Sequence, residues 1–265
     1  MQVNSVNHEV NLQGSRVELI DAQLRVGAFS PHRHDTYTVA VTTSGVQTFN
    51  YRGERWESRP GQVVILHPDE VHDGYCRDQA GFSYRAAYVP PAHVQTVIGG
   101  AALPFLAKGV STDADLAGSA LRLIAMCSAG HDLFGYQDAL HQLVCAMQRS
   151  ESGRLPARRN ANREAVMRVR DFLDSVPAPS TNLDQLEDLA GYDRWQLSRD
   201  FRVLLGTSPY RYLQCRRLER ARQLVRSGLG MAAAAHEAGF ADQSHFGRVF
   251  KRTFGTTPLA WHRAG

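Results

Sequence analysis

A run of charged, amide and aromatic residues occurs twice in the last third of the chain, at an offset of 49 residues. The first copy runs from Asp193 to Pro209 and the second from Asp242 to Pro258, and Asp, Arg, Phe, Gly, Thr and Pro recur in both. A repeat of this length is typical of one supersecondary unit used twice. Arginine and glutamine side chains have the donor geometry for guanine and adenine edges, so this unit could read DNA bases.

Each copy is predicted to form a helix-turn-helix, the unit that places its second helix in the major groove of DNA. The first helices are expected at residues 183–190 and 232–238, and glycines that follow them allow the positive φ angle of a tight turn. Asp193 and Asp242 stand where the second helices begin. A carboxylate there accepts hydrogen bonds from free backbone amides and suits the positive end of the helix.

Both second helices, the recognition helices, carry apolar residues four positions apart, Leu197 with Phe201 and Phe246 with Phe250. These are expected to face the core. The remaining positions are expected to face DNA, where arginine and glutamine contact base edges and serines, arginines and capped amides hold phosphates. The expected DNA-binding residues are Arg194, Trp195, Gln196, Ser198, Arg199, Arg202, Gln243, Ser244, His245, Gly247, Arg248 and Lys251.

Two alternatives stay open for this set. Arg199 and Arg248 occupy the same place in both copies, which suits an internal ion pair as well as a DNA contact. His245 either contacts the groove or packs at the edge of the core.

A helix between the two copies is predicted to begin at Pro209, with Ser208 as its cap, and to run to about residue 226. Its roughly 18 residues would span about 27 Å. Adjacent major-groove windows on one face of DNA lie about 34 Å apart. This helix could therefore hold the two recognition helices near that separation. Bending of the DNA would make up the difference between the length of the helix and the spacing of the groove windows.

Short strands are predicted for residues 15–90, where apolar and polar residues alternate between glycine and proline breaks. Such strands favour a β-sandwich or barrel. Near residue 92 the pattern becomes helical. Residues 151–163 are polar and lack periodicity, so we expect them to link a domain of residues 1–150 to a domain of residues 164–265.

One of the helices expected before the linker has an apolar stripe, made by Leu140, Leu143, Val144 and Met147. Their spacing of i, i+3, i+4 and i+7 is that of one helix face. The stripe packs either on the strands or on the same stripe of a second subunit, so a homodimer is one expectation.

Charge is divided unevenly along the chain. The net charge is +4 at pH 7, of which residues 1–150 contribute −3 and residues 151–265 contribute +7. This asymmetry favours one domain that faces DNA and one that avoids phosphates.

Other features of the sequence exclude several classes of protein. The four cysteines form no C-x-x-C pair, which disfavours a zinc knuckle or a disulfide framework. No apolar run approaches the ~20 residues that span a bilayer, and the N-terminal residues lack the apolar core of a signal peptide. We therefore expect a cytoplasmic protein with no membrane partner.

The stretch from Gly239 to Pro258, GFADQSHFGRVFKRTFGTTP, resembles the AraC/XylS family of bacterial transcription regulators. The likeness extends over roughly residues 165–262. It implies a seven-helix DNA-binding domain, reading of an asymmetric site by each subunit, and activation through contact with RNA polymerase.

Residues 31–37 and 60–72, PHRHDTY and PGQVVILHPDEVH, resemble that family's sensor, a cupin-type barrel. The combined resemblance implies an α+β multidomain chain. Its N-terminal part would be a cupin-like β-barrel with trailing helices, an effector-binding and dimerisation domain. Its C-terminal part would be an all-α domain with two helix-turn-helix units.

Three histidines are the centre of the expected sensor pocket. His32 and His34 are two apart and project together from a strand, and His72 takes the place of the later cupin histidine. The expected effector-binding residues are His32, His34, Tyr37, His72, Tyr84 and Arg85, the arginine suiting a carboxylate ligand. The alternatives are histidines that are purely structural and histidines that bind a divalent metal. The absence of a glutamate shortly after the paired histidines disfavours the metal, so no cofactor is expected.

The function predicted from these features is that of a DNA-binding transcription regulator, not an enzyme, controlled by a small-molecule effector. The effector would shift the balance between two arrangements of the protein through differential affinity. Two alternatives are a metal-dependent cupin enzyme with a DNA-binding tail and a constitutive regulator whose barrel only dimerises.

Overall fold

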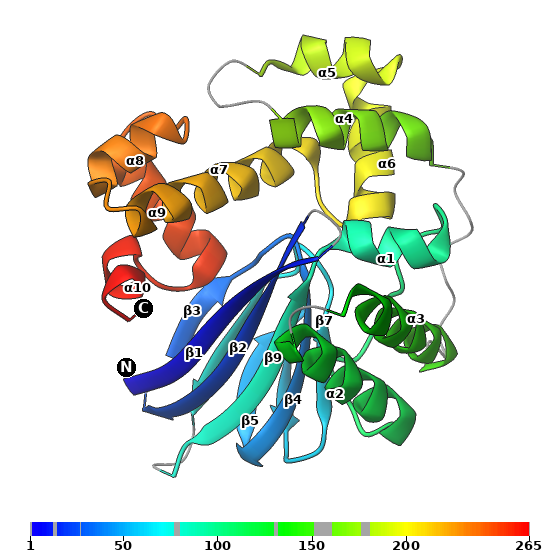
Figure 1. The fold of residues 1–265 in the computed structure, drawn as a ribbon, viewed down its shortest axis with the longest axis vertical. Coiled ribbons are helices and arrows are strands. Elements are labelled where there is room, and N and C mark those ends of the chain that lie inside the picture. Colours follow the sequence, from blue (N-terminus) through cyan, green and yellow to red (C-terminus); the bar gives the residue numbers. More distant parts are fainter. Residues whose placement is uncertain are drawn as a thin grey trace. The chain divides into compact units, whose positions relative to one another are not determined.

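The computed structural model describes residues 2–12, 15–26, 28–76, 80–129, 132–150, 161–175 and 181–264. The described residues form two compact units (Figure 1). The N-terminal unit contains the described residues of 1–31 and 36–159, and the C-terminal unit contains residues 32–35 and the described residues of 160–265. Most of the predicted linker lies outside the described residues.

Two antiparallel sheets form the framework of the N-terminal unit. In order across the larger sheet, the strands are β1 (Gln2–Leu12), β2 (Ser15–Val26), β9 (Phe82–Val89), β4 (Tyr37–Gly45), β7 (Val63–Leu66) and β10 (Val110–Ser111). The smaller sheet has the order β3 (Ala28–His32), β8 (His72–Cys76), β5 (Gln47–Tyr51) and β6 (Glu54–Ser58). Three helices follow the strands or interrupt them: α1 (Pro91–Ile98), α2 (Ala114–Ala129) and α3 (Leu133–Ser150).

Strand β7 shows how the larger sheet is buried on both faces. All four of its residues are buried, and successive side chains of a strand point to opposite faces. Val63 and Ile65 belong to the apolar cluster shared with helices α1, α2 and α3, whereas Val64 and Leu66 belong to the cluster shared with the smaller sheet. The larger sheet is thus the middle layer of this unit.

The apolar stripe of α3 packs inside this unit. Leu140, Leu143, Val144 and Met147 are each at most 2% exposed and join the cluster between the larger sheet and the helices. Of the two expectations for this stripe, the structure supports packing within the chain.

Helices alone form the C-terminal unit in the part that the structure describes (Figure 1). They are α4 (Arg163–Ser175), α5 (Leu183–Ala190), α6 (Arg194–Leu205), α7 (Pro209–Arg226), α8 (Met231–Glu237), α9 (Gln243–Phe254) and α10 (Pro258–Ala264). Helices α5 and α6 form the first helix-turn-helix and α8 and α9 the second. Among the described helices, none combines the length and the hydropathy needed to cross a membrane.

Helix α7 connects the two helix-turn-helix copies and begins at the predicted residue. Pro209 is its first residue, and the Ser208 side chain accepts a hydrogen bond from the amide of Arg211. Because proline has no amide to satisfy and a fixed φ, it suits the first position of a helix. The 18 residues of α7 pack against helices of both copies, α4 and α6 on one side and α8 and α9 on the other.

One partly buried histidine of the N-terminal unit, His67, gives the fold a pH dependence. The His67 ring packs edge-on against Tyr37 and Phe105, at centroid distances of 5.3 and 5.5 Å. Its Nδ1 lies 3.1 Å from the carbonyl oxygen of Pro68. The pKa of His67 is lowered from 6.5 to about 4, mainly because the buried ring would lose its hydration when charged. The positive charge of Arg52 adds to this lowering of the pKa, and the hydrogen bond with the Pro68 carbonyl opposes it.

Because the unfolded chain binds a proton at His67 near pH 6.5 and the folded chain only near pH 4, acid favours unfolding in this window. We expect the His67 contribution to stability to fall by up to about 3 kcal/mol between pH 7.5 and pH 4. His67→Asn, which keeps a donor for the Pro68 carbonyl, should flatten the pH dependence of the melting temperature in scanning calorimetry. His236→Asn, at an exposed position, should leave it unchanged. Identical pH profiles for His67→Asn and the wild type would contradict this assignment.

Candidate nucleic-acid interface and sensor site

The first recognition helix, α6, packs one face against the core and exposes the opposite face to solvent. Leu197 and Phe201 are at most 2% exposed, whereas Trp195 is 73% exposed. The Asp193 carboxylate accepts hydrogen bonds from the amides of Trp195 and Gln196, which starts the helix at the predicted residue. Asp193 therefore fixes where the exposed face begins.

Arg194 lies on α6 but is bound back to α5. Its guanidinium donates to both carboxylate oxygens of Glu187, at 3.0 and 2.6 Å, and to Asp184 at 3.1 Å. The backbone amide of Arg194 also donates to Glu187, at 2.7 Å. These hydrogen bonds lower the pKa of the Glu187 carboxyl below its usual value. The structure thus gives Arg194 an intramolecular role that the sequence analysis did not assign.

Other predicted contacts of α6 are linked to one another along the helix. Arg199 donates to the amide oxygen of Gln196 at 3.1 Å, and Arg202 donates to the Ser198 side chain and carbonyl. Arg199 and Arg202 are exposed, and neither forms a salt bridge with a carboxylate among the described residues. They are therefore available to an external anion.

The second recognition helix, α9, presents its predicted residues in the same way. Gln243, Ser244, Arg248 and Lys251 are exposed, and Gly247 is half-buried. The Asp242 carboxylate accepts from the amide of His245 at 2.6 Å and caps the helix.

His245 differs from the other predicted contacts of α9. Its ring is half-buried and packs edge-on against Phe240 at 5.5 Å between centroids. Of the two alternatives for this residue, the geometry supports packing at the edge of the core.

A buried carboxylate that the sequence analysis missed stabilises the first helix-turn-helix. Asp200 is 5% exposed and accepts from the Asn162 amide at 3.1 Å, the Tyr192 hydroxyl at 3.3 Å and the Gln196 amide group at 3.4 Å. It therefore connects the start of α4 and the turn before α6. The only signal in the sequence is an acidic residue directly before Phe201, on the side of α6 that faces the core.

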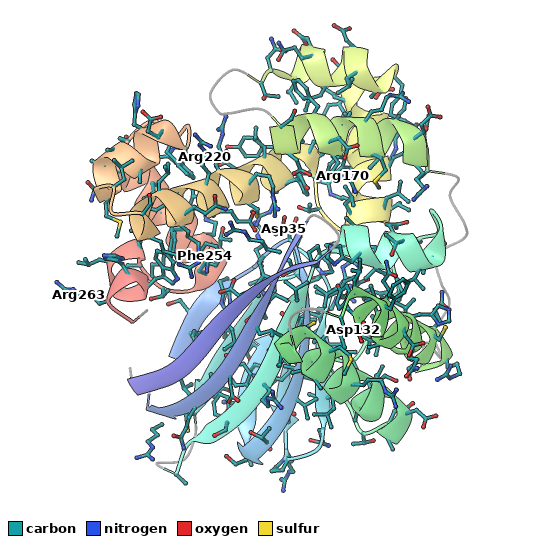
Figure 2. The ribbon with its side chains drawn as sticks, viewed as in Figure 1. Asp35, Asp132, Arg170, Arg220, Phe254 and Arg263 are labelled. Carbon is teal, nitrogen blue, oxygen red and sulfur yellow. The ribbon has the colours of Figure 1, made fainter. Side chains whose placement is uncertain are left out.

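The second helix-turn-helix is held by aromatic rings. Phe246, Phe250, Phe254 and Trp261 form a chain of ring contacts, with centroids 4.6 to 5.6 Å apart. Arg222 is 7% exposed, and its guanidinium carbon lies 4.9 and 5.1 Å from the ring centroids of Phe254 and Trp261. Phe254 is labelled in Figure 2. A desolvated cation over an aromatic face is attracted by the ring quadrupole, so this arginine serves the core.

The predicted sensor residues divide between the two faces of the larger sheet. Tyr84 points toward the smaller sheet, and its burial raises its pKa to about 12. Arg85, the next residue, points the other way; its side chain lies 3.5 Å from Asp21 and from the Ser128 hydroxyl. Tyr37 also lies on the helical side, where its hydroxyl donates to the Pro104 carbonyl at 2.7 Å. Contrary to expectation, Tyr37 and Arg85 do not line one pocket with Tyr84.

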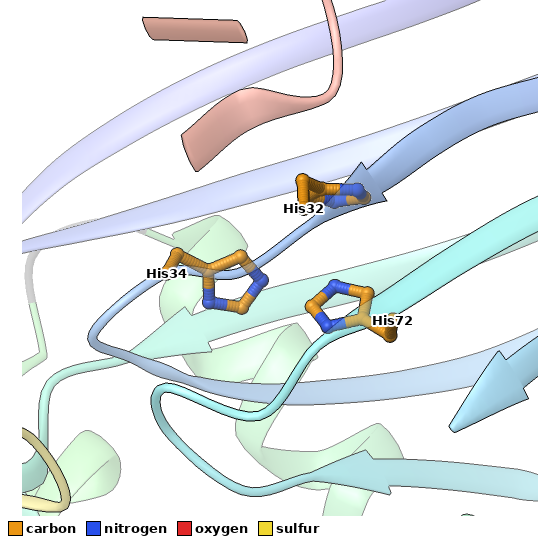
Figure 3. A group of neighbouring side chains, drawn as sticks. All are labelled: His32, His34 and His72. Carbon is orange, nitrogen blue, oxygen red and sulfur yellow. The ribbon is translucent and has the colours of Figure 1, made fainter. Parts of the chain in front are cut away.

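The three predicted histidines do converge (Figure 3). His32 ends β3, His72 begins β8, and these strands are neighbours in the smaller sheet. One ring nitrogen from each of His32, His34 and His72 lies within 4.8 Å of the others. His34 and His72 are buried and His32 is half-buried.

Two family models match the chain in these same regions. The AraC-like ligand binding domain matches residues 15–144, and a helix-turn-helix domain matches residues 186–264. The chain belongs to the AraC family of transcription regulators. It is therefore a DNA-binding regulator that has a ligand-binding domain beside its two helix-turn-helix units.

Curated relatives of this regulator agree with the assignment. It is 26% identical over 222 residues to the HTH-type transcriptional regulator YbfI of Bacillus subtilis (strain 168), with 82% of this chain and 81% of YbfI covered. It is 25% identical over 252 residues to the HTH-type transcriptional activator RhaS of Pectobacterium carotovorum subsp. carotovorum (strain PC1), with 87% and 86% covered.

Among solved structures, ToxT from Vibrio cholerae O395 resembles the regulator in fold. The TM-score is 0.64 at 11% sequence identity, with 99% of this chain and 97% of ToxT covered. At this identity the likeness concerns the fold alone.

Removing the Asp200 carboxylate should destabilise the first helix-turn-helix. Asp200→Ala leaves the partly buried donors of Asn162, Tyr192 and Gln196 without this acceptor, which costs about 1–3 kcal/mol. We expect this loss in urea denaturation followed by circular dichroism. Asp188→Ala, which removes an exposed carboxylate from α5, is the matched control and should change the stability by less than about 0.5 kcal/mol. Equal effects of the two substitutions would refute the role given to Asp200.

Substitution of Arg194 should show whether its role is structural or a contact with DNA. In the wild type its guanidinium donates two hydrogen bonds to the Glu187 carboxylate. Lysine keeps the charge but cannot reproduce two parallel hydrogen bonds. Arg194→Lys should therefore lower the melting temperature while the salt dependence of DNA binding stays as in the wild type. Arg199→Lys is the control, because Arg199 does not donate two hydrogen bonds to a carboxylate in the described structure. This variant should have the melting temperature of the wild type. A wild-type melting temperature for Arg194→Lys would show that the fork contributes nothing.

Proposed function

We propose that α6 and α9 insert into successive major-groove windows of one DNA site. Support comes from two capped helices whose buried faces leave Trp195, Arg202, Gln243, Arg248 and Lys251 exposed. These side chains carry positive charge, amide donors and one large aromatic surface, the chemistry that phosphates and base edges require. The exposed, capped face of each recognition helix is the observation that carries the proposal.

Within this interface, we assign different tasks to the predicted residues. Trp195, Gln196, Gln243 and Ser244 stand in the first turns of the recognition helices, the part that contacts base edges in helix-turn-helix proteins. Ser198, Arg199, Arg202, Gly247, Arg248 and Lys251 stand farther along and would hold phosphates. Arg194 and His245 support the interface from within, since their side chains are bound to α5 and to Phe240.

The length of α7 supports simultaneous contact of α6 and α9 with one DNA site. A helix of 18 residues spans about 27 Å, less than the roughly 34 Å between groove windows on one face of straight DNA. Bound DNA would bend toward the protein to close this difference, at a cost of a few kcal/mol that the extra contacts offset.

We further propose that the N-terminal domain, residues 1–150, binds a small-molecule effector and forms a homodimer, and that the linker, residues 151–163, passes the effect to residues 164–265. RhaS is named an activator, which supports activation of transcription through contact with RNA polymerase. Because the protein would act on DNA, we propose the cytoplasm as its location. Relatives named as regulators favour this reading over an enzyme with a DNA-binding tail.

Trp195 offers a direct test. Footprinting and gel shifts on the DNA upstream of the protein's own gene should show sequence-preferring, salt-sensitive binding. Trp195→Ala should weaken binding to the preferred site by about tenfold, because it removes a groove contact of roughly 1–3 kcal/mol. Phe134→Ala removes an aromatic ring from the N-terminal unit, where Phe134 is 85% exposed, and should have no effect. Absence of any sequence preference in the wild type would end the proposal.

Phosphate contacts should show in the salt dependence. Lys251→Ala is expected to weaken binding to all DNA sequences alike and to reduce the slope of log affinity against log salt by about 1. Specific binding of Lys251→Ala with an unchanged slope would remove Lys251 from the interface.

A further inference from the structure

We propose that α7 makes a third contact with DNA, in which Arg217 binds the phosphate backbone midway between the groove windows of α6 and α9. This contact rests on the proposed function, because it requires that both recognition helices occupy one DNA site. Arg217 belongs to neither recognition helix and is not among the residues that the sequence predicts to bind DNA.

Arg217 is a half-buried cation that has no hydrogen-bond or salt-bridge partner among the described residues. Its Nε atom is shielded from solvent and has no acceptor. Loss of hydration lowers the pKa of Arg217 below its usual value, and the neighbouring Tyr210 opposes this lowering. Charged groups that lose hydration are normally paired, so an unpaired one costs free energy in the protein alone. An anion from outside the chain would offset this cost.

Two neighbours of Arg217 on α7 also lack hydrogen-bond partners for their side chains within the described residues. Tyr210, Gln214 and Arg217 stand at i, i+4 and i+7, the spacing of one helix face, and form the α7 stripe. Tyr210 is 61% exposed, whereas Gln214 is 8% exposed and its side-chain oxygen is buried without a donor. A hydroxyl, an amide and a guanidinium can all donate to phosphate oxygens. The α7 stripe therefore offers three donor groups to one anionic ligand.

The charges along α7 favour DNA as this ligand. On another flank of α7, Arg216 forms a salt bridge with Glu219 at 3.1 Å, and Glu219 is the only acidic residue of the helix. Arg220, three residues after Arg217, is exposed and adds a second positive charge beside the α7 stripe. A positive surface with amide and hydroxyl donors complements the regular negative charge of a DNA backbone.

The position of Arg217 within α7 indicates which part of the DNA it contacts. Arg217 is the ninth of the 18 residues of α7, so about 12 Å of helix precede it and about 14 Å follow. Between two major-groove windows on one face of DNA, the minor groove and the phosphate backbones that border it face the protein. A helix that connects α6 and α9 runs along this stretch, with Arg217 near its centre. Bending of the DNA toward the protein would narrow this minor groove and strengthen its negative potential, which attracts arginine.

The salt dependence of DNA binding tests the contact in the full-length protein. Arg217→Met removes the charge and keeps an apolar stem. The variant should bind the site found by footprinting about three- to tenfold more weakly, as expected for the loss of a hydrogen-bonded charge. The slope of log affinity against log salt should decrease by about 1. Arg122→Met removes one positive charge from an exposed position of α2 and is the matched control, which should keep the affinity and slope of the wild type.

The melting temperature separates this contact from a structural role. A partly buried cation without a counter-charge does not stabilise the free protein, so Arg217→Met should melt at the wild-type temperature or above it. A clearly lower melting temperature for Arg217→Met would assign the arginine to the fold and overturn the proposal.

Neutral phosphates give a readout that is specific to the position on the DNA. In this duplex, methylphosphonates replace the phosphates midway between the two groove windows that footprinting locates. The wild type should bind this duplex more weakly than the unmodified site, because the central charges are gone. Arg217→Met should bind both duplexes equally, since the two changes remove the same interaction.

An unchanged salt slope in Arg217→Met, or an equal loss by both proteins on the neutralised duplex, would overturn the contact. Reduced transcription with unchanged DNA binding would also overturn it and would assign the α7 stripe to an acidic protein surface. If Trp195→Ala weakens binding in the same assays while Arg217→Met behaves as the wild type, only the third contact fails. Absence of sequence-preferring binding by the wild type would instead refute the proposed function, and the third contact with it.

Discussion

Burial of two side chains four positions apart sets the rotation of each recognition helix about its own axis. Leu197 and Phe201 fix α6, and Phe246 and Phe250 fix α9. Once these faces are buried, the 3.6-residue period decides which remaining side chains can meet a ligand. The N-cap aspartates, Asp193 and Asp242, determine the residue at which each helix begins. The whole candidate interface follows from these two constraints.

The two copies reach this geometry with different interactions. The first copy depends on polar groups: the buried Asp200 carboxylate and the fork between Arg194 and Glu187. Such hydrogen bonds are directional, and removing one of the groups bonded to Asp200 leaves this buried carboxylate with fewer donors. The second copy depends on packed aromatic rings and on the Arg222 guanidinium over Trp261, which the ring quadrupole attracts. Its short first helix brings Ala234 and Ala235, wholly buried, against the rest of the unit.

In the N-terminal unit, the alternation of side chains along each strand separates residues that are close in sequence. Tyr84 and Arg85 are adjacent, yet one faces the smaller sheet and the other the helices. Buried layers lie on both sides of the larger sheet, so neither apolar content nor position in the chain distinguishes its two faces. The positions of histidines at the ends of neighbouring strands do not depend on which face of the larger sheet is which, because the strand pairing itself brings them together.

From the sequence alone, the family, the two-part division, the helix-turn-helix units and the starts of α6, α7 and α9 could be predicted. These features depend on local signals, namely caps, proline, glycine turns and apolar spacing, which act within a few residues. The partners of Arg194, Asp200 and His245 could not, because they include residues of other helices and turns that tertiary packing brings close. The same holds for Tyr37 and Arg85, whose direction depends on which face of a doubly buried sheet meets the helices. Local chemistry determines where elements begin and end, whereas tertiary packing decides which polar side chains remain free to act.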